Sequence, residues 1–391
     1  MKNNYNHTIT ACYIGYITQA VVNNFAPLLF LTFSRQFGLS LDRIALITTV
    51  NFAVQLQVDL VSATLIDAVG YRASVIAAHV FSAAGLTALA WLPFILSSPF
   101  QGILAAVVLY AVGGGLIEVI VSPIVEACPT ARKEAAMSLL HSFYCWGHVA
   151  VVVISTVFFR FFGIGHWRVL AVLWAAVPVF NAVFFTRVPI FSITGGKTPL
   201  SLRALFRERL FWIFLAVMVC AGASEHAMSQ WASAFAESAL GVSKTLGDLA
   251  GPCSFALLMG ISRALYGKYS EQLELKKALS LSAVMCICAY LLSSLTRHPA
   301  LGLLGCGICG FSVGIFWPGT FSLAAGKLPA AGTAMYAFMA LAGDLGCSGG
   351  PTLVGITAGA LGGDLRRGLL LALVFPALIL VNVALLGKEE R

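Results

Sequence analysis

A glutamate stands inside the apolar stretch GGGLIEVIVSPIVEACPT, residues 113–130, whose other residues suit a membrane interior. An ionisable side chain that is charged and faces hydrocarbon is costly, so such a group faces a partner or a polar cavity. Burial favours the neutral form of this residue, Glu118, whereas water or a cationic neighbour such as protonated His141 favours the carboxylate. We therefore predict that Glu118 takes up and releases a proton, with His141 and Glu225 as the other members of a proton-coupling set.

Amide side chains occur inside several of the same apolar runs. Asn51, Gln55 and Asp59 are each four residues apart, so they form one stripe on a helix. A polar set spread over several runs favours an aqueous cavity over hydrogen bonds between packed helices. Amides can bind the hydroxyls of a sugar or polyol, and aromatic rings can bind its apolar face. The expected substrate-binding residues are Gln19, Asn23, Asn24, Asn51, Gln55, Gln230, Trp231 and Trp317, with a packing role as the alternative for each tryptophan.

The elements that must position these residues are membrane-spanning helices. Of the 391 residues, 59% are hydrophobic and 10% are charged, whereas soluble domains carry about 25% charged residues. A helix needs about 20 apolar residues to cross the bilayer, and the apolar runs are continuous, unlike the alternating strands of a β-barrel. We predict an all-α polytopic membrane protein with twelve spans, at residues 8–33, 41–66, 73–96, 102–126, 136–160, 168–188, 208–236, 246–267, 277–296, 299–325, 331–358 and 365–387.

Basic residues are distributed unevenly between the two sides of the membrane. If both termini are cytoplasmic, the cytoplasmic segments hold fifteen Lys and Arg residues and the outer segments hold eight. Cytoplasmic loops carry the excess of positive charge, so we expect a multi-pass protein of the cell (inner) membrane with both termini inside. This topology accounts for the net charge of +8 and leaves no basic extramembrane segment for nucleic acid. The expected partners are the lipid bilayer and a small solute, and the expected state is a monomer.

The cysteines do not indicate a metal or redox site. Cys306 and Cys309 have the spacing of such a pair, but the run GLLGCGICGF lacks a second pair and a nearby histidine. We expect small buried thiols, no disulfide, no metal and no cofactor, with the proton as the coupling ion. A membrane-embedded enzyme or receptor finds no support, because the chain has no nucleophile motif and no ligand-binding loop domain.

The longest polar break, VPIFSITGGKTPLSLRALFRERL at 188–210, divides the spans into six and six. It predicts an N-terminal six-helix bundle at 1–188, a cytoplasmic linker at 189–207 and a C-terminal six-helix bundle at 208–391. This layout resembles the major facilitator superfamily. The stretches SATLIDAVGYRAS (62–74) and MGISRALYGKYSEQ (259–272) resemble the charged cytoplasmic loop of that superfamily. The resemblance implies a cytoplasmic latch made of Asp67, Gly70, Arg72, Arg263 and Lys268.

Within the superfamily, three short motifs look like the fucose:proton symporter family. Ile117-Glu118-x-x-x-Ser122-Pro123 resembles its fourth-helix motif, an apolar residue and Glu followed by Asn-Pro, whose glutamate takes part in proton coupling. CGICGFSVGIFWPGTFSLA (306–324) and AGDLGCSGGP (342–351) resemble its tenth and eleventh helices. The family also carries an aspartate in the first helix, where this chain has Asn23-Asn24, which cannot titrate. The resemblance implies proton-coupled symport of a sugar or sugar-like polyhydroxylated solute by alternating access, and the missing acid argues against fucose itself.

Alternative functions of the same fold are a carrier of an organic anion, an exporter of an amphiphile and an uncoupled uniporter. An anion carrier is expected to place Arg or Lys near the middle of the first, fourth, seventh or tenth span, and none occurs there. Arg263 is expected near the end of the eighth span. A drug:proton antiporter is expected to have a glycine- and proline-rich fifth span, whereas LLHSFYCWGHVAVVVIST has no proline.

Overall fold

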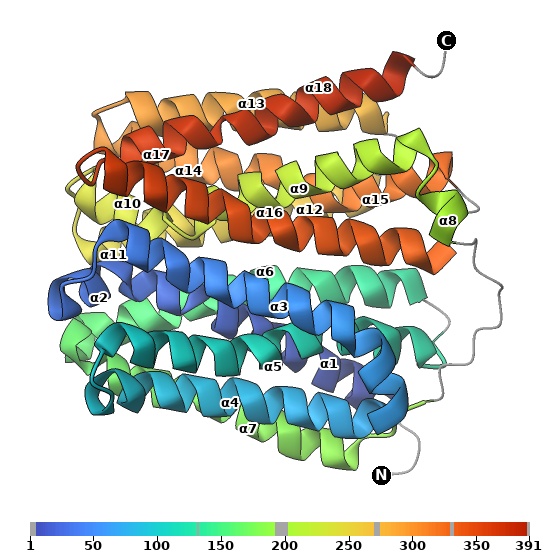
Figure 1. Cartoon of the computed structure of the whole chain (residues 1–391), viewed down its shortest axis with the longest axis horizontal. Helices are drawn as coiled ribbons and strands as arrows, with labels where there is room; N and C mark the ends of the chain where they lie inside the picture. Colours follow the sequence, from blue (N-terminus) through green and yellow to red (C-terminus); the bar gives the residue numbers. More distant parts are fainter. Residues whose placement is uncertain (1–4, 131–132, 192–201, 270–273, 329–331, 389–391) are drawn as a thin grey trace. The chain divides into compact units, whose positions relative to one another are not determined.

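The computed structural model describes residues 5–130, 133–191, 202–269, 274–328 and 332–388, which form helices and short connections (Figure 1). The chain divides into two compact units, Met1–Gly195 and Gly196–Arg391, and each is described by itself. Residues 192–201, in the middle of the predicted linker at 189–207, lie outside the described residues. Within the described ranges, eleven helical segments are long and apolar enough to cross a membrane.

The first span of the N-terminal unit is interrupted. A 3₁₀ turn with Pro27 in its first turn separates its two helices, because proline lacks the N–H that would continue the ladder of hydrogen bonds. The other five spans of this unit are single helices. The bounds are α1 (Tyr5–Asn24), η1 (Ala26–Leu29), α2 (Phe30–Phe37), α3 (Leu41–Val69), α4 (Tyr71–Ile95), α5 (Pro99–Ala127), α6 (Lys133–Phe162), η2 (Ile164–His166) and α7 (Trp167–Arg187).

Most spans of the C-terminal unit are built from two pieces. The bounds are α8 (Leu202–Leu205), α9 (Arg209–Ser229), α10 (Ala232–Ser238), α11 (Lys244–Asp248), η3 (Leu249–Cys253), α12 (Ser254–Tyr269), α13 (Leu275–Leu295), α14 (Pro299–Val313), α15 (Phe316–Lys327), α16 (Gly332–Ala360), α17 (Leu365–Ala372) and α18 (Val374–Lys388). The element η3 is a π-helical turn that contains Pro252. The eleven segments correspond to eleven of the twelve predicted runs. The helix α16, which has 29 residues, corresponds to the remaining predicted run at 331–358.

Glycines bring the helices of each unit into close contact. A Cβ at Gly113 of α5 would lie 2.2 Å from Ser82 Oγ of α4, and α4 packs along α5 (Figure 1). In the C-terminal unit a Cβ at Gly305 of α14 would lie 2.2 Å from Ser293 Oγ of α13. Small residues let membrane helices pack tightly where there is no hydrophobic force to hold them together. The two units therefore repeat the same kind of helix contact.

A second repeat lies at the start of the last span of each unit. Arg168, the second residue of α7, donates from Nε to Ala90 O of α4 at 2.6 Å, and its guanidinium lies 4.1 Å from the centroid of the Phe94 ring. Arg366, the second residue of α17, donates to Thr296 O after α13 and to Ala239 O after α10. Each arginine donates to carbonyl groups of neighbouring helices, and those that Arg366 reaches follow helix C-termini, where carbonyls lack intrahelical partners. The sequence repeat at 62–74 and 259–272 gave no indication of this pair.

A buried polar contact joins α1, α4 and α7. His79 Nδ1 lies 2.7 Å from Val75 O, and Asn181 Nδ2 lies 2.7 Å from His79 Nε2 and 3.0 Å from Ala11 O. The carbonyl can only accept, so Nδ1 carries the proton and Nε2 accepts from the Asn181 amide. His79 is completely buried, and its contacts hold helices together.

We expect Asn181→Leu to lower the free energy of unfolding by about 1–3 kcal/mol, because it removes the donor to the buried His79 Nε2 and Ala11 O. The control is Asn382→Leu, since Asn382 is partly exposed on α18 and donates to Leu378 O of its own helix. Unfolding in detergent, followed by tryptophan fluorescence, gives the comparison. Equal loss of stability in both variants would contradict the structural role of the contact.

Candidate functional site

The central residue of the N-terminal unit is Glu118, which lies in the interior of α5. Gln19 Nε2 of α1 donates to Glu118 Oε2 at 2.6 Å, and Gln19 is buried. A second contact lies one turn before Gln19 on α1 and one turn after Glu118 on α5, where Tyr16 Oη lies 3.1 Å from Ser122 Oγ. The helix α1 thus presents two polar groups to α5, one at the carboxyl group and one just before Pro123. A hydrogen-bonded carboxyl group inside a span can exist in both protonation states, as proton coupling requires.

A second acidic side chain lies close to Glu118. The helices α3 and α5 approach at Gly115, where a Cβ would lie 3.0 Å from Gln55 Cα and 3.1 Å from Val58 Cβ. Asp59 of α3 follows this contact, and it interacts electrostatically with Glu118. Two neighbouring carboxylates repel each other, and protonation of one relieves the repulsion. Asp59 belongs to the stripe seen in the sequence, but its position beside Glu118 depends on the packing of α3 on α5.

Three amides form a buried cluster between α1 and α3. Asn23 Oδ1 accepts from Asn51 Nδ2 at 3.0 Å and from Gln55 Nε2 at 2.8 Å, and all three side chains are buried. The cluster confirms that Asn51 and Gln55 share one face of their helix. Among the described residues, Asn51 Oδ1 has no hydrogen-bond partner. A buried acceptor without a donor is unfavourable, so this oxygen is suited to receive a hydrogen bond from a bound hydroxyl or water.

Asn24 and His141 lie at the contact between α1 and α6. Asn24 Nδ2 donates to Ala20 O at 3.0 Å and to Tyr144 Oη of α6 at 3.3 Å. His141, also on α6, is exposed, and its ring centroid lies 5.4 Å from that of Tyr16. The structure therefore places His141 beside the tyrosine that contacts Ser122. The tyrosines were missed in the sequence, although Tyr16 lies three residues before Gln19 and Tyr144 three after His141, a spacing that places each pair on one helix face.

The C-terminal unit contains an ion pair inside its spans. Glu225 Oε2 of α9 lies 3.4 Å from Arg263 Nη2 of α12, and 5% and 17% of the two side chains are exposed. The sequence predicts Arg263 near the end of its span and in the cytoplasmic latch. The helix α12 ends at Tyr269, six residues after Arg263, and the guanidinium reaches a buried residue of α9. The sequence thus provides Glu225 as a candidate, and the structure provides its partner.

The two tryptophans of the predicted binding set lie in helix contacts. Trp231 follows α9 and is completely buried, with Nε1 donating to Pro351 O of α16 at 3.0 Å. Gln230, next to it, is also buried. Trp317 of α15 packs against α16 so closely that a Cβ at Gly343 would lie 2.2 Å from its Cη2. The sequence leaves a packing role open for each tryptophan. The burial of Trp231 fits that role, and we leave this residue out of the proposed binding set.

The predicted latch residues of the first copy surround the turn between α3 and α4. Gly70 has φ of +89°, a conformation that favours glycine, and it ends α3. Arg72 donates from Nη1 to Phe185 O at 2.6 Å and from Nη2 to Val188 O at 2.9 Å, at the end of α7. The side chain of Asp67 lies outside the described residues. In the second copy Lys268 is exposed, with Nζ 5.2 Å from the Tyr269 ring centroid.

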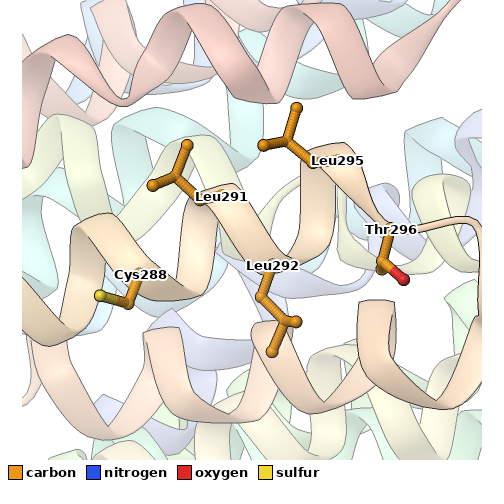
Figure 2. Close-up of a pocket in the computed structure, with 5 residues that line it drawn as sticks. All are labelled: Cys288, Leu291, Leu292, Leu295 and Thr296. Carbon is orange, nitrogen blue, oxygen red and sulfur yellow. The ribbon is translucent and has the colours of Figure 1, made fainter.

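A shallow apolar depression lies along α13, lined by Cys288, Leu291, Leu292, Leu295 and Thr296 (Figure 2). Its lining residues all come from one helix and its C-terminal end. A solute site needs several polar groups that converge from different elements. The depression does not meet this requirement, so the polar clusters of α1, α3 and α5 remain the candidate site.

Comparison with protein families matches residues 12–351 to the Major Facilitator Superfamily. No curated protein matches the chain. A solved bacterial homolog of the human lysosomal transporter Spinster, inward-facing and unoccupied, is similar with a TM-score of 0.81 and 14% identity over 99% of this chain and 98% of that one. The E. coli fucose:proton symporter, FucP, is similar with a TM-score of 0.66 and 17% identity over 98% of this chain and 99% of that one. The match over most of its length shows that the chain belongs to the major facilitator superfamily.

Proposed function

We propose that the chain is a secondary transporter that carries a sugar-like polyhydroxylated solute together with protons across the cell membrane. In this proposal both termini are cytoplasmic, and bundles at 1–188 and 208–391 give alternating access to the solute through their relative movement. The observation that carries the proposal is the arrangement in the N-terminal unit, where a hydrogen-bonded glutamate and a cluster of three amides occur on α1, α3 and α5.

The amide cluster supports recognition of hydroxyl groups. Asn23 Oδ1 is already a double acceptor, whereas Asn51 Oδ1 needs a donor. A hydroxyl group can donate to this oxygen and accept from a neighbouring amide N–H at the same time. A solute with several hydroxyl groups therefore replaces the hydrogen bonds that it loses when it leaves water.

Glu118 supports proton coupling because its partner can follow a change of protonation. Gln19 now donates to the carboxyl oxygen. If Glu118 takes up a proton, its O–H can donate to the Gln19 carbonyl oxygen once the amide rotates, so both states are hydrogen-bonded. Protonation also removes the repulsion from Asp59. A solute that binds the protonated form more tightly then links its own movement to that of the proton.

The similarity to a fucose:proton symporter supports this combination of sugar and proton. At 17% identity, the similarity is one of fold. The asparagines at 23 and 24 lack the titrating group that the related family carries there, so Glu118 and its neighbours supply the coupling. Among those neighbours, His141 is exposed and lies next to Tyr16, which supports a role for its imidazole in proton exchange. Glu225 is the coupling candidate of the other unit.

The test combines binding with uptake. The purified protein is screened for thermal stabilisation by glucose, mannitol, methyl glucoside, glucuronate and gluconate, because a ligand that binds the folded state raises its stability. The stabilising solute is then offered to proteoliposomes with and without an imposed pH gradient. We expect accumulation that requires the gradient and disappears with a protonophore. Uptake that ignores the gradient would contradict proton coupling.

The same screen tests the amide cluster. Asn51→Leu should weaken binding roughly 10- to 100-fold, because it removes both the orphaned acceptor and a donor to Asn23. The matched control is Gln57→Leu, since Gln57 is an exposed amide on the same helix. Binding that survives Asn51→Leu unchanged would exclude the cluster as the hydroxyl site.

A further inference from the structure

We propose that Arg263 binds an acidic group of the transported solute, with Glu225 occupying the guanidinium when the solute is absent. The inference rests on the proposed transport function and narrows its substrate class to acidic sugars, such as hexuronates. Neither the family match nor the similar structures assign a role to this pair. Both residues lie in the C-terminal unit.

The ion pair is loose. Its contact joins Nη2 and Oε2 at 3.4 Å, whereas strong arginine–carboxylate bonds measure about 2.7–2.9 Å and are often bidentate. A guanidinium presents a planar fork of five N–H donors that matches a carboxylate. The Nη2–Oε2 contact is therefore longer than a strong arginine–carboxylate hydrogen bond. A second carboxylate can compete for this position.

The place of the pair inside the spans argues for a function. A buried ion pair adds little stability over an apolar pair of the same size, because both charges lose their hydration. Ionisable residues inside membrane spans therefore mark solute or ion pathways by default. The helix α12 packs mainly on α14, and α9 packs mainly on α16. Arg263 of α12 therefore reaches across to a helix that is not the main packing partner of α12. Its side chain is also more exposed than that of Glu225, at 17% against 5%.

Other polar and titratable groups of the described residues lie near the pair. His226, next to Glu225 on α9, interacts electrostatically with both Glu225 and Arg263. Cys309 of α14 interacts with Glu225, and Tyr290 of α13 donates to Ser224 O at 2.8 Å. Among these groups, Arg263 is the permanent cation, because arginine keeps its proton in proteins. An anionic group that enters this region therefore finds its binding partner in Arg263.

Replacement of Glu225 by a solute carboxylate at Arg263 changes the charge of the pair and so couples solute binding to proton uptake. Before the solute binds, Arg263 and Glu225 sum to zero charge. When the solute carboxylate takes the guanidinium, Glu225 is left as an unpaired buried anion unless it accepts a proton, and such an anion is strongly unfavourable. The proton on Glu225 restores the sum to zero. One proton therefore accompanies each acidic solute at this pair, with no other reactant required.

The inference also changes the interpretation of the sequence. The sequence argues against an anion carrier because the usual spans lack a cation near their middle, and it predicts Arg263 near a helix end. The pairing with Glu225, a buried residue in the seventh span, brings a cation from the eighth span to this residue, although the seventh span has no arginine near its middle. Hydroxyl recognition by amides and carboxylate recognition by Arg263 are both properties that a hexuronate would use.

The experiment compares matched acidic and neutral probes on the full chain. Thermal stabilisation is titrated with D-glucuronate against D-glucose and with D-gluconate against sorbitol. We expect the wild type to bind at least one acid about 10- to 100-fold more tightly than its neutral partner, and Arg263→Gln to lose this preference. Glu225→Gln should bind the acid more tightly than the wild type, because the internal competitor is weakened.

Folding of the variants is controlled by replacing the pair together. The double variant Arg263→Met with Glu225→Leu removes both charges, so no unpaired ion is left in the membrane, and it should fold without the preference for acids. A preference for acids that persists in the double variant or in Arg263→Gln overturns the proposal. Stronger binding of the neutral partners by the wild type, or no stabilisation by any acid, also overturns it. If the preference for acids persists in these variants, gradient-driven uptake of the neutral solute still supports the transport function. Uptake that does not depend on the gradient contradicts the transport function itself.

Discussion

Glu118→Gln is expected to abolish proton-driven accumulation of a neutral solute, which leaves the Arg263–Glu225 pair intact, while binding and exchange across the membrane continue. The replacement has the shape of the protonated side chain and keeps an oxygen that can accept from Gln19 Nε2, so the local packing is preserved. It cannot release a proton, however, so movement of the solute no longer depends on the proton gradient. With one coupled proton, a gradient of one pH unit supports about tenfold accumulation in the wild type. The variant should only equilibrate the solute.

The measurement is uptake into proteoliposomes with and without the pH gradient, together with exchange of labelled against unlabelled solute. Glu208→Gln serves as the control, because Glu208 is an exposed carboxylate just before α9. The control should accumulate the solute as the wild type does. Accumulation by Glu118→Gln at the wild-type ratio would remove Glu118 from the coupling mechanism, and loss of exchange as well would show that the variant is inactive for another reason.

Gly346→Ala is expected to destabilise the C-terminal unit strongly for so small a change. A Cβ at this position of α16 would lie 1.9 Å from Val219 O and 2.8 Å from Ala223 N of α9. These atoms belong to the backbone of a packed helix, so they cannot rotate away, and the two helices must separate. Overpacking of a well-packed interior costs about 1–3 kcal/mol, and here the backbone contact places the effect at the upper end.

Gly349→Ala on the same helix is the matched control. No atom lies within 4 Å of a Cβ built at Gly349, and alanine is favoured over glycine in a helix by about 1 kcal/mol. Thermal unfolding in detergent should therefore show a clear fall for Gly346→Ala and no fall for Gly349→Ala. Similar unfolding temperatures for both variants would contradict the close approach of α9 and α16.

The helices could be predicted from the sequence to within a few residues, because hydrophobic length alone decides whether a segment crosses a bilayer. The predicted run 102–126 and the observed α5, Pro99–Ala127, differ by one residue at the end and by three at the start, where Ser98 caps the helix and Pro99 begins it. Interruptions inside a run were invisible to hydropathy. The break after α9 at Gln230 and the π-helical turn before α12 leave the apolar pattern intact, so 208–236 and 246–267 were each predicted as one helix.

The candidate site could be predicted as a set of residues, but its pairings could not. Spacing within one helix placed Asn51 and Gln55 on one face, and both donate to Asn23. The contact of Glu118 with Gln19 joins residues 99 positions apart, and it depends on how α1 packs on α5. Periodicity describes one helix at a time, so it cannot supply such a partner. For the same reason Glu225 was recognised as a candidate without its partner Arg263.

Proton movement driven by the solute tests the central claim most directly. Proteoliposomes containing a trapped pH-sensitive dye, with no imposed gradient, receive a neutral solute that stabilises the purified protein, so that no proton moves on Glu225 in place of a solute carboxylate. Solute that moves down its own gradient should carry protons with it and acidify the interior in the wild type, in the Glu208→Gln control as well, and not in Glu118→Gln. Solute uptake without acidification in the wild type, or equal acidification in Glu118→Gln, would contradict the account.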